Sequence, residues 1–150
     1  MCNLKSGLIL KDGVYIPFDD DKHENMIQEK GLKDDSTTPC FVRFEFVPKG
    51  DVFNHNKDNW TFKVDQDYLP KWFDKAKAEK RAWEQMQEWF KERFIVDNDE
   101  WQEKEGRLYV RNAKVVAREN SSVTAWGNSS VVARGNSSVT AWGNSSVEAR

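Results

Sequence analysis

The segment NSSVTAWG-NSSVVARG-NSSVTAWG-NSSVEAR, residues 120–150, repeats one eight-residue unit and decides how the C-terminal part of the chain folds. The same spacing reaches back to NAKVVARE at residues 112–119, so that every unit begins with asparagine. Valine stands at the fourth position and alanine at the sixth position of each unit, whereas the fifth and seventh positions vary. This constancy favours an ordered repeat over a disordered tail rich in serine and asparagine.

The alternation within each unit predicts a strand of about six residues whose even positions share one face. Gly-Asn at the junctions supplies the turns. In an antiparallel meander, the constant and variable positions would mix on one face, whereas a coil keeps them apart. We therefore predict a two-sided β-solenoid in which two units of eight, 16 residues, form each coil. The predicted core consists of Val123, Val131, Val139, Val147, Ala125, Ala133, Ala141 and Ala149.

Arginine and tryptophan alternate at the seventh position, so two-unit coils would stack arginines on one face and tryptophans on the other, about 4.8 Å apart. Stacked guanidinium groups repel each other unless a carboxylate or phosphate lies between them. Exposed indoles stack on sugars, bases or another protein. The alternative is that both rows only shield a thin sheet or dock on the N-terminal domain. The candidate binding residues are Arg118, Trp126, Arg134, Trp142 and Arg150.

The pattern of apolar segments in residues 1–111 predicts an α+β domain, which precedes the repeats at 112–150. The Asp12-Gly13 pair between apolar segments indicates a hairpin. Two further apolar stretches, residues 41–47 and 60–65, predict strands of the same antiparallel sheet, and residues 20–30 predict a short helix.

From Pro70 onward, apolar side chains recur at helical spacing, which predicts one long amphipathic helix that covers the sheet. Its apolar face consists of Trp72, Phe73, Ala76, Trp83, Met86, Phe90 and Phe94.

Composition limits the classes of function. The chain has 150 residues and a formal net charge of −2, so there is no overall electrostatic attraction to nucleic acid. No apolar run approaches the roughly 20 residues of a membrane span, and the first residues do not read as an export signal. Two cysteines fit a reducing compartment. We expect a cytoplasmic protein without cofactor or bound metal.

One group of carboxylates suggests chemistry. Asp65 and Asp67 share a strand face, and Glu45 can lie on the neighbouring strand, as in metal-dependent nucleases. The simpler interpretation is a solvated face with cross-strand ion pairs, and Asp67 as the cap of the long helix. We therefore predict a non-catalytic binding or assembly protein whose repeat tail is a rigid spacer or a protein-interaction surface. A small metal-dependent hydrolase or nuclease that uses Glu45, Asp65 and Asp67 is the alternative.

Three stretches of the sequence are similar to those of a known protein family: CNLKSGLILK at residues 2–11, WTFKVDQDYLPKWF at residues 60–73, and the repeats. They resemble a family, with no activity assigned to it, of small proteins from gut anaerobic bacteria and their phages or mobile elements. The resemblance implies that the number of repeats varies among members, and it implies a phage or mobile-element origin. Because the repeats stop midway through a coil, we expect an uncovered strand edge and end-to-end self-association.

Overall fold

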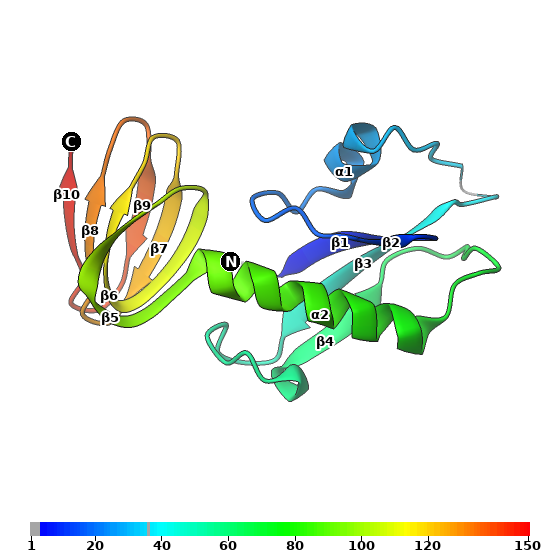
Figure 1. The fold of residues 1–150 in the computed structure, drawn as a ribbon, viewed down its shortest axis with the longest axis horizontal. Helices are drawn as coiled ribbons and strands as arrows, with labels where there is room; N and C mark the ends of the chain where they lie inside the picture. Colours follow the sequence, from blue (N-terminus) through cyan, green and yellow to red (C-terminus); the bar gives the residue numbers. More distant parts are fainter. Residues whose placement is uncertain (1–3, 36) are drawn as a thin grey trace. The chain divides into compact units, whose positions relative to one another are not determined.

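The computed structural model describes residues 4–35 and 37–150 (Figure 1). The chain divides into two compact units, Met1–Glu88 and Trp89–Arg150. The predicted boundary between residues 111 and 112 lies inside strand β6 (Arg107–Ala117). No helix in the described ranges is both long enough and apolar enough to cross a membrane.

The first unit contains an antiparallel sheet in which the described strands follow the order β2-β1-β3-β4. Its strands are β1 (Lys5–Leu10), β2 (Gly13–Tyr15), β3 (Phe41–Pro48) and β4 (Trp60–Val64), with a 3₁₀ turn, η1 (Lys57–Asn59), before β4. The hairpin predicted at Asp12-Gly13 is confirmed, because Leu10 pairs with Gly13 across the turn. The strands predicted at 41–47 and 60–65 correspond to β3 and β4.

Among the described residues there are two α-helices, α1 (His23–Glu29), which lies within the range predicted for a short helix, and α2 (Lys75–Arg93). Both helices cover the sheet, so a sheet covered by the long helix alone is not the arrangement found. Both faces of the sheet carry large apolar side chains, and each face packs against a helix (Figure 1). Phe46 on one face contacts Trp83 of α2, with ring centroids 5.5 Å apart. On the other face, Met26 of α1 packs in a buried cluster that also holds Leu8, Ile27 and Phe41.

Helix α2 begins at Lys75 rather than near Pro70, because Asp74 provides its N-terminal cap. The Asp74 carboxylate accepts a hydrogen bond from the Lys77 amide at 3.2 Å. Trp72 and Phe73 therefore precede the helix, and the prediction that Asp67 caps it is wrong. The buried face of α2 consists of Ala78, Ala82, Met86, Trp89 and Phe90.

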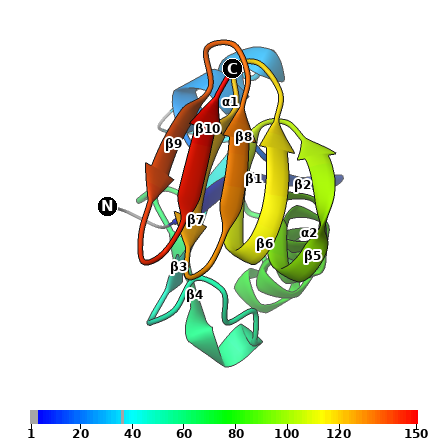
Figure 2. The same cartoon turned by 90° about the vertical axis from the view of Figure 1, so that its left-hand side faces the viewer.

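The second unit is a β-solenoid of about four turns, as the repeat predicted, and its described strand pairs are all parallel (Figures 1 and 2). Strand β6 bends at Asn112, where φ is 52°, and so contributes to both sides of the solenoid. One half of β6 pairs with β7 and the other half with β8. The other strands are β5 (Phe94–Lys104), β7 (Ser122–Trp126), β8 (Ser130–Ala133), β9 (Ser138–Ala141) and β10 (Ser146–Ala149).

The constant positions of the repeat point inward in the early coils. Val123, Ala125, Val131 and Ala133 are buried, together with Leu108 and Val110, which lie on β6 before the first repeat unit. Inward serines form hydrogen bonds both within a turn and between coils. The Ser129 hydroxyl donates to the Trp126 carbonyl at 2.7 Å, within its own turn. The Ser137 hydroxyl donates to the Arg118 carbonyl of the preceding coil. The even positions of the unit therefore form the interior of these coils.

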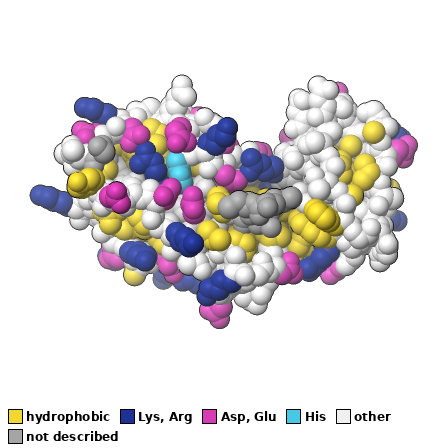
Figure 3. Space-filling view, turned by 180° about the vertical axis from the view of Figure 1, so that it is seen from behind, with side chains coloured by type: hydrophobic (Ala, Val, Ile, Leu, Met, Phe, Trp, Pro, Cys, Tyr) yellow, Lys and Arg dark blue, Asp and Glu magenta, His cyan; other side chains and the backbone are white. Residues whose placement is uncertain are grey.

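Glycine is required at the turn after Trp126. Gly127 has a φ of 64°, and a Cβ added there would lie 2.3 Å from the Asn112 side-chain oxygen. That oxygen also accepts a hydrogen bond from the Asn128 amide at 3.0 Å, so the Asn112 side chain bonds to a backbone group of the next coil. Charged side chains are frequent over the first unit on the face that Figure 3 shows, whereas the solenoid there shows mainly uncharged surface.

Candidate functional site

The two predicted tryptophans lie at equivalent positions on consecutive coils. Ala125 pairs with Ala141, and the Trp142 amide donates to the Ala125 carbonyl at 2.8 Å. The row extends farther than the sequence indicated, because Tyr109 stacks on Trp126 with centroids 6.5 Å apart and an interplanar angle of 9°. Phe94 in turn stacks on Tyr109 at 4.6 Å. We call Phe94, Tyr109, Trp126 and Trp142 the aromatic row.

The first end of the aromatic row is covered by the last turns of α2. Trp89 contacts Phe94 edge-on at 5.0 Å and Tyr109 at 5.8 Å between centroids. Phe90 also contacts Phe94, and all three of Trp89, Phe90 and Phe94 are buried. At the other end, Trp142 is 52% exposed. Trp142 is therefore the accessible indole of the predicted pair.

The three predicted arginines also occupy equivalent positions, since Arg134 and Arg150 donate their amides to the carbonyls of Ala117 and Ala133. Glu103 of β5 lies between two of them: its Oε1 is 3.2 Å from Arg118 Nε and 3.4 Å from Arg134 Nη1. Arg150 pairs with Glu148 at 3.0 Å. The chain therefore supplies the carboxylates that a row of stacked guanidinium groups requires. Glu103 was missed because it lies outside the repeats.

The last coil, β9 and β10, is the least covered part of the solenoid. Each of these strands has a described partner on one side alone: β7 for β9 and β8 for β10. Val147 is 46% exposed, whereas Val131, its partner on β8, is 1% exposed. We call the surface formed by Val139, Ala141, Trp142, Val147 and Ala149 the open end.

The predicted carboxylates separate into two groups. Glu45 lies on β3 and Asp65 directly follows β4, and within the described ranges these two lie near His23, which the sequence analysis did not select. Asp67 instead lines a hollow of about 300 Å³ together with Asp34, Asp35, Pro39, Arg43, Gln66 and Tyr68.

The charged side chains that line this hollow form ion pairs and hydrogen bonds with other residues of the chain. Arg43 pairs with Asp34 at 2.7 Å. Hydrogen bonds from the Thr37 amide and from the Thr38 and Thr37 hydroxyls lower the pKa of Asp35 to about 2. Asp34 and Asp35 are thus accounted for by local turn and ion-pair contacts.

No family model, curated protein or solved structure matches this chain. The family resemblance of the sequence therefore stays a prediction.

Proposed function

We propose that this protein is a non-catalytic assembly module in which the solenoid, wound in 16-residue coils, is a rigid interaction surface. The partner that we propose for its open end is a second copy of this chain. The observation that carries the proposal is the exposure of Val147 at 46%, when Val131 one coil earlier is buried. Uncovered strand edges beside exposed apolar side chains are sites of strand addition.

The regular spacing of the repeats suits the stacking of one coil on another, because each strand can pair in register with an equivalent strand. Ser130 pairs with Lys114 on one side and with Ser146 on the other, so β8 is held between strands of matching register. The Ser146 and Ser130 hydroxyls lie 3.2 Å apart. A strand that brings small apolar and hydroxyl side chains therefore suits the outer edges of β9 and β10, and the open end of a second copy presents this set of residues.

Two open ends related by a two-fold axis bring β9 and β10 edges together in antiparallel pairs. Such an interface uses the same surface on both copies, so it closes a dimer instead of building a filament. Glu148 and Arg150 pair within one chain at 3.0 Å, so their charges largely cancel at the β10 edge. Trp142 directly follows β9 and adds exposed aromatic area, the type of side chain enriched in protein interfaces.

Sedimentation of the 150-residue chain over a range of concentrations tests the proposal. The expected result is a concentration-dependent dimer, which Val139→Lys and Val147→Lys convert to a monomer because they bring charge into the apolar contact. Thr124→Lys is the matched control, since Thr124 is an outward-facing residue of β7, one coil before the open end. A chain that remains monomeric at millimolar concentration, or a dimer that resists both valine substitutions, contradicts the proposal.

A further inference from the structure

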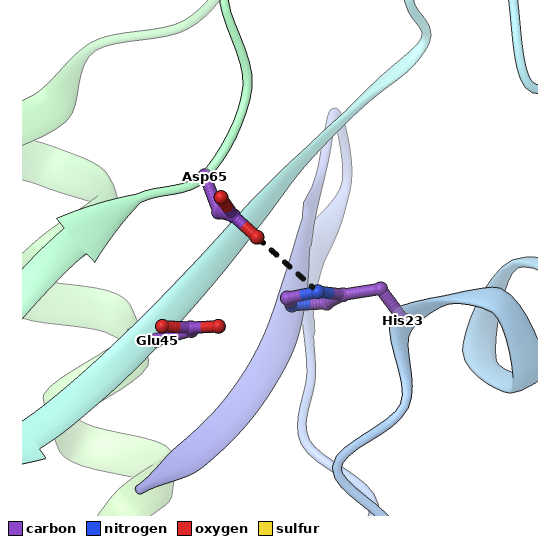
Figure 4. Close-up of side chains that lie close together, drawn as sticks. All are labelled: His23, Glu45 and Asp65. Atoms are coloured by element: carbon purple, nitrogen blue, oxygen red, sulfur yellow. Dashed lines mark ion pairs between the residues drawn. The ribbon is translucent and has the colours of Figure 1, made fainter.

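The first unit contains a cluster of one histidine and two carboxylates, none of which belongs to the open end. His23 is the first residue of α1, Glu45 lies on β3, and Asp65 directly follows β4. Figure 4 shows the three side chains converging from these elements. Each offers a nitrogen or oxygen ligand atom, and these atoms all lie within 4.8 Å of one another.

The sheet register explains why the two carboxylates meet. Glu45 pairs with Lys63 across β3 and β4, and Asp65 follows two residues later, so both acids belong to the same face of the sheet. This face carries α1, whose Met26 and Ile27 pack against Leu8. The helix therefore brings His23 over residues that are 22 and 42 positions distant in the sequence (45 − 23 and 65 − 23).

The His23 ring is fixed in an orientation suited to binding a metal. The residue is 8% exposed, and its Nε2 lies 3.0 Å from the Phe44 carbonyl oxygen. Because a carbonyl oxygen can only accept, Nε2 carries the hydrogen and donates it. In the neutral ring, Nδ1 then presents its lone pair toward Asp65, whose Oδ2 is 3.9 Å away. Histidines that bind metals commonly donate their other ring N–H to a backbone carbonyl in this way.

The surrounding side chains leave the charge of the two acids largely uncompensated. Over residues 4–35 and 37–150, the Glu45 carboxylate makes no hydrogen bond or ion pair, and the neighbouring Lys63 makes no ion pair with it. On its other side Glu45 faces Ser6, whose buried hydroxyl has no hydrogen-bond partner in the described ranges. Two carboxylates and an imidazole lone pair that converge in this way repel one another, and a metal cation between them would remove that repulsion.

We propose that His23 Nδ1 and the carboxylates of Glu45 and Asp65 bind a divalent first-row transition metal, with Zn²⁺ as the best match. Mixed imidazole and carboxylate ligands suit this class of ion, whereas Mg²⁺ and Ca²⁺ prefer oxygen alone. Zinc bonds of about 2.1 Å in a tetrahedron place ligand atoms about 3.4 Å apart. The Asp65 side chain is 61% exposed and can close the remaining gap from 3.9 Å. Three protein ligands leave a coordination position for water.

Calorimetric titration of the untagged 150-residue chain with Zn²⁺, and absorption spectra with Co²⁺ as the visible probe, test this proposal. We expect one Zn²⁺ per chain and d–d bands of cobalt in a site of low coordination number. Glu45→Gln and Asp65→Asn each weaken binding about tenfold or more, since each removes one charged ligand. The matched control is Asp67→Asn, which removes an exposed carboxylate of the same loop and leaves the affinity within twofold.

Three results overturn the proposal: no heat of binding with Zn²⁺, an equal loss of affinity in the Asp67 control, or a cobalt–thiolate charge-transfer band that places the ion on a cysteine. Glu45 and Asp65 carry no structural hydrogen bond through their side chains, so the variants are expected to fold, and far-UV circular dichroism checks this. The ligands belong to the first unit and the open end to the second, so metal binding and dimerisation succeed or fail independently.

Discussion

The two ends of the solenoid are built from similar strands but are covered very differently. At the first end, Trp89 and Phe90 of α2 close over Phe94 and Tyr109, and three of these four residues are buried. At the open end, β9 and β10 repeat the valines and alanines of the preceding coil without a layer above them. Burial of a repeat residue therefore depends on the neighbouring coil and not on the repeat itself.

The contact with the end of α2 also explains why the solenoid begins at Phe94, before the first repeat unit at Asn112. Strand β5 pairs with β6 from Phe94 to Lys104, and neither strand starts with an asparagine unit. Aromatic side chains of varied size fill the irregular space between a helix end and a first coil, which a uniform valine and alanine repeat could not fill. Terminal coils of repeat proteins commonly differ in sequence from internal ones for this reason.

The largest expected difference between the ends concerns two tryptophans. Trp89→Ala removes a buried ring and should destabilise the solenoid by about 3–5 kcal/mol. Trp142→Ala removes a half-exposed ring and should change stability by no more than about 0.5 kcal/mol in the monomer. Hydrogen–deuterium exchange of the β6 and β7 amides measures both effects locally, which suits a chain of two units. Equal protection in the two variants would show that the aromatic contacts do not hold the first coil.

A smaller difference is expected between two valines of the repeat. Val131→Ala removes two methyl groups from the interior and should cost about 1.5–3 kcal/mol, whereas Val147→Ala should cost about 0.5 kcal/mol or less. Both are measured by chemical denaturation at a concentration where the chain is monomeric. The same measurement at higher protein concentration tests the interface. The cost of Val147→Ala in unfolding free energy should increase if the open end is an interface, and a cost that does not change with concentration argues against it.

The smallest expected effect concerns the arginine row. Glu103→Gln removes the carboxylate between Arg118 and Arg134 and should cost about 0.5–1 kcal/mol at low salt, because the groups are half-exposed. Glu148→Gln removes a single pair at the open end and should cost less. Both losses should disappear near 1 M salt, where the Debye length is about 3 Å. A loss from Glu103→Gln that persists in high salt would indicate a packing role for Glu103 rather than an electrostatic one.

Much of the solenoid could be predicted from the repeat. The parallel coil, the inward valines and the separate rows of arginine and tryptophan follow from one alternation, because a strand shows its two faces directly in its sequence. The coil formed by β5 and the residues of β6 that precede the repeats could not be predicted in this way. The bend at Asp97 places a non-glycine residue at positive φ, and no periodic pattern marks this position.

The first unit was predicted less completely. The hairpin at Asp12-Gly13 has a strong local signal, and it is present. The start of α2 was placed several residues early because Pro70 and Asp67 look like a helix start, while Asp74 provides the cap in the structure. His23 was not among the predicted site residues, since its neighbours Glu45 and Asp65 are distant in the sequence and meet only through the strand pairing of β3 and β4.

The repeat is sufficient to predict that the C-terminal residues form stacked parallel strands with a valine and alanine interior, because period and polarity are properties of a local stretch of chain. That Trp89 covers one end of this stack, while Val147 is left exposed at the other, follows from tertiary contacts and could not be predicted from the repeat. Tertiary contacts also bring His23, Glu45 and Asp65 together. These outcomes depend on contacts between residues far apart along the chain, and such contacts leave no periodic trace in the sequence.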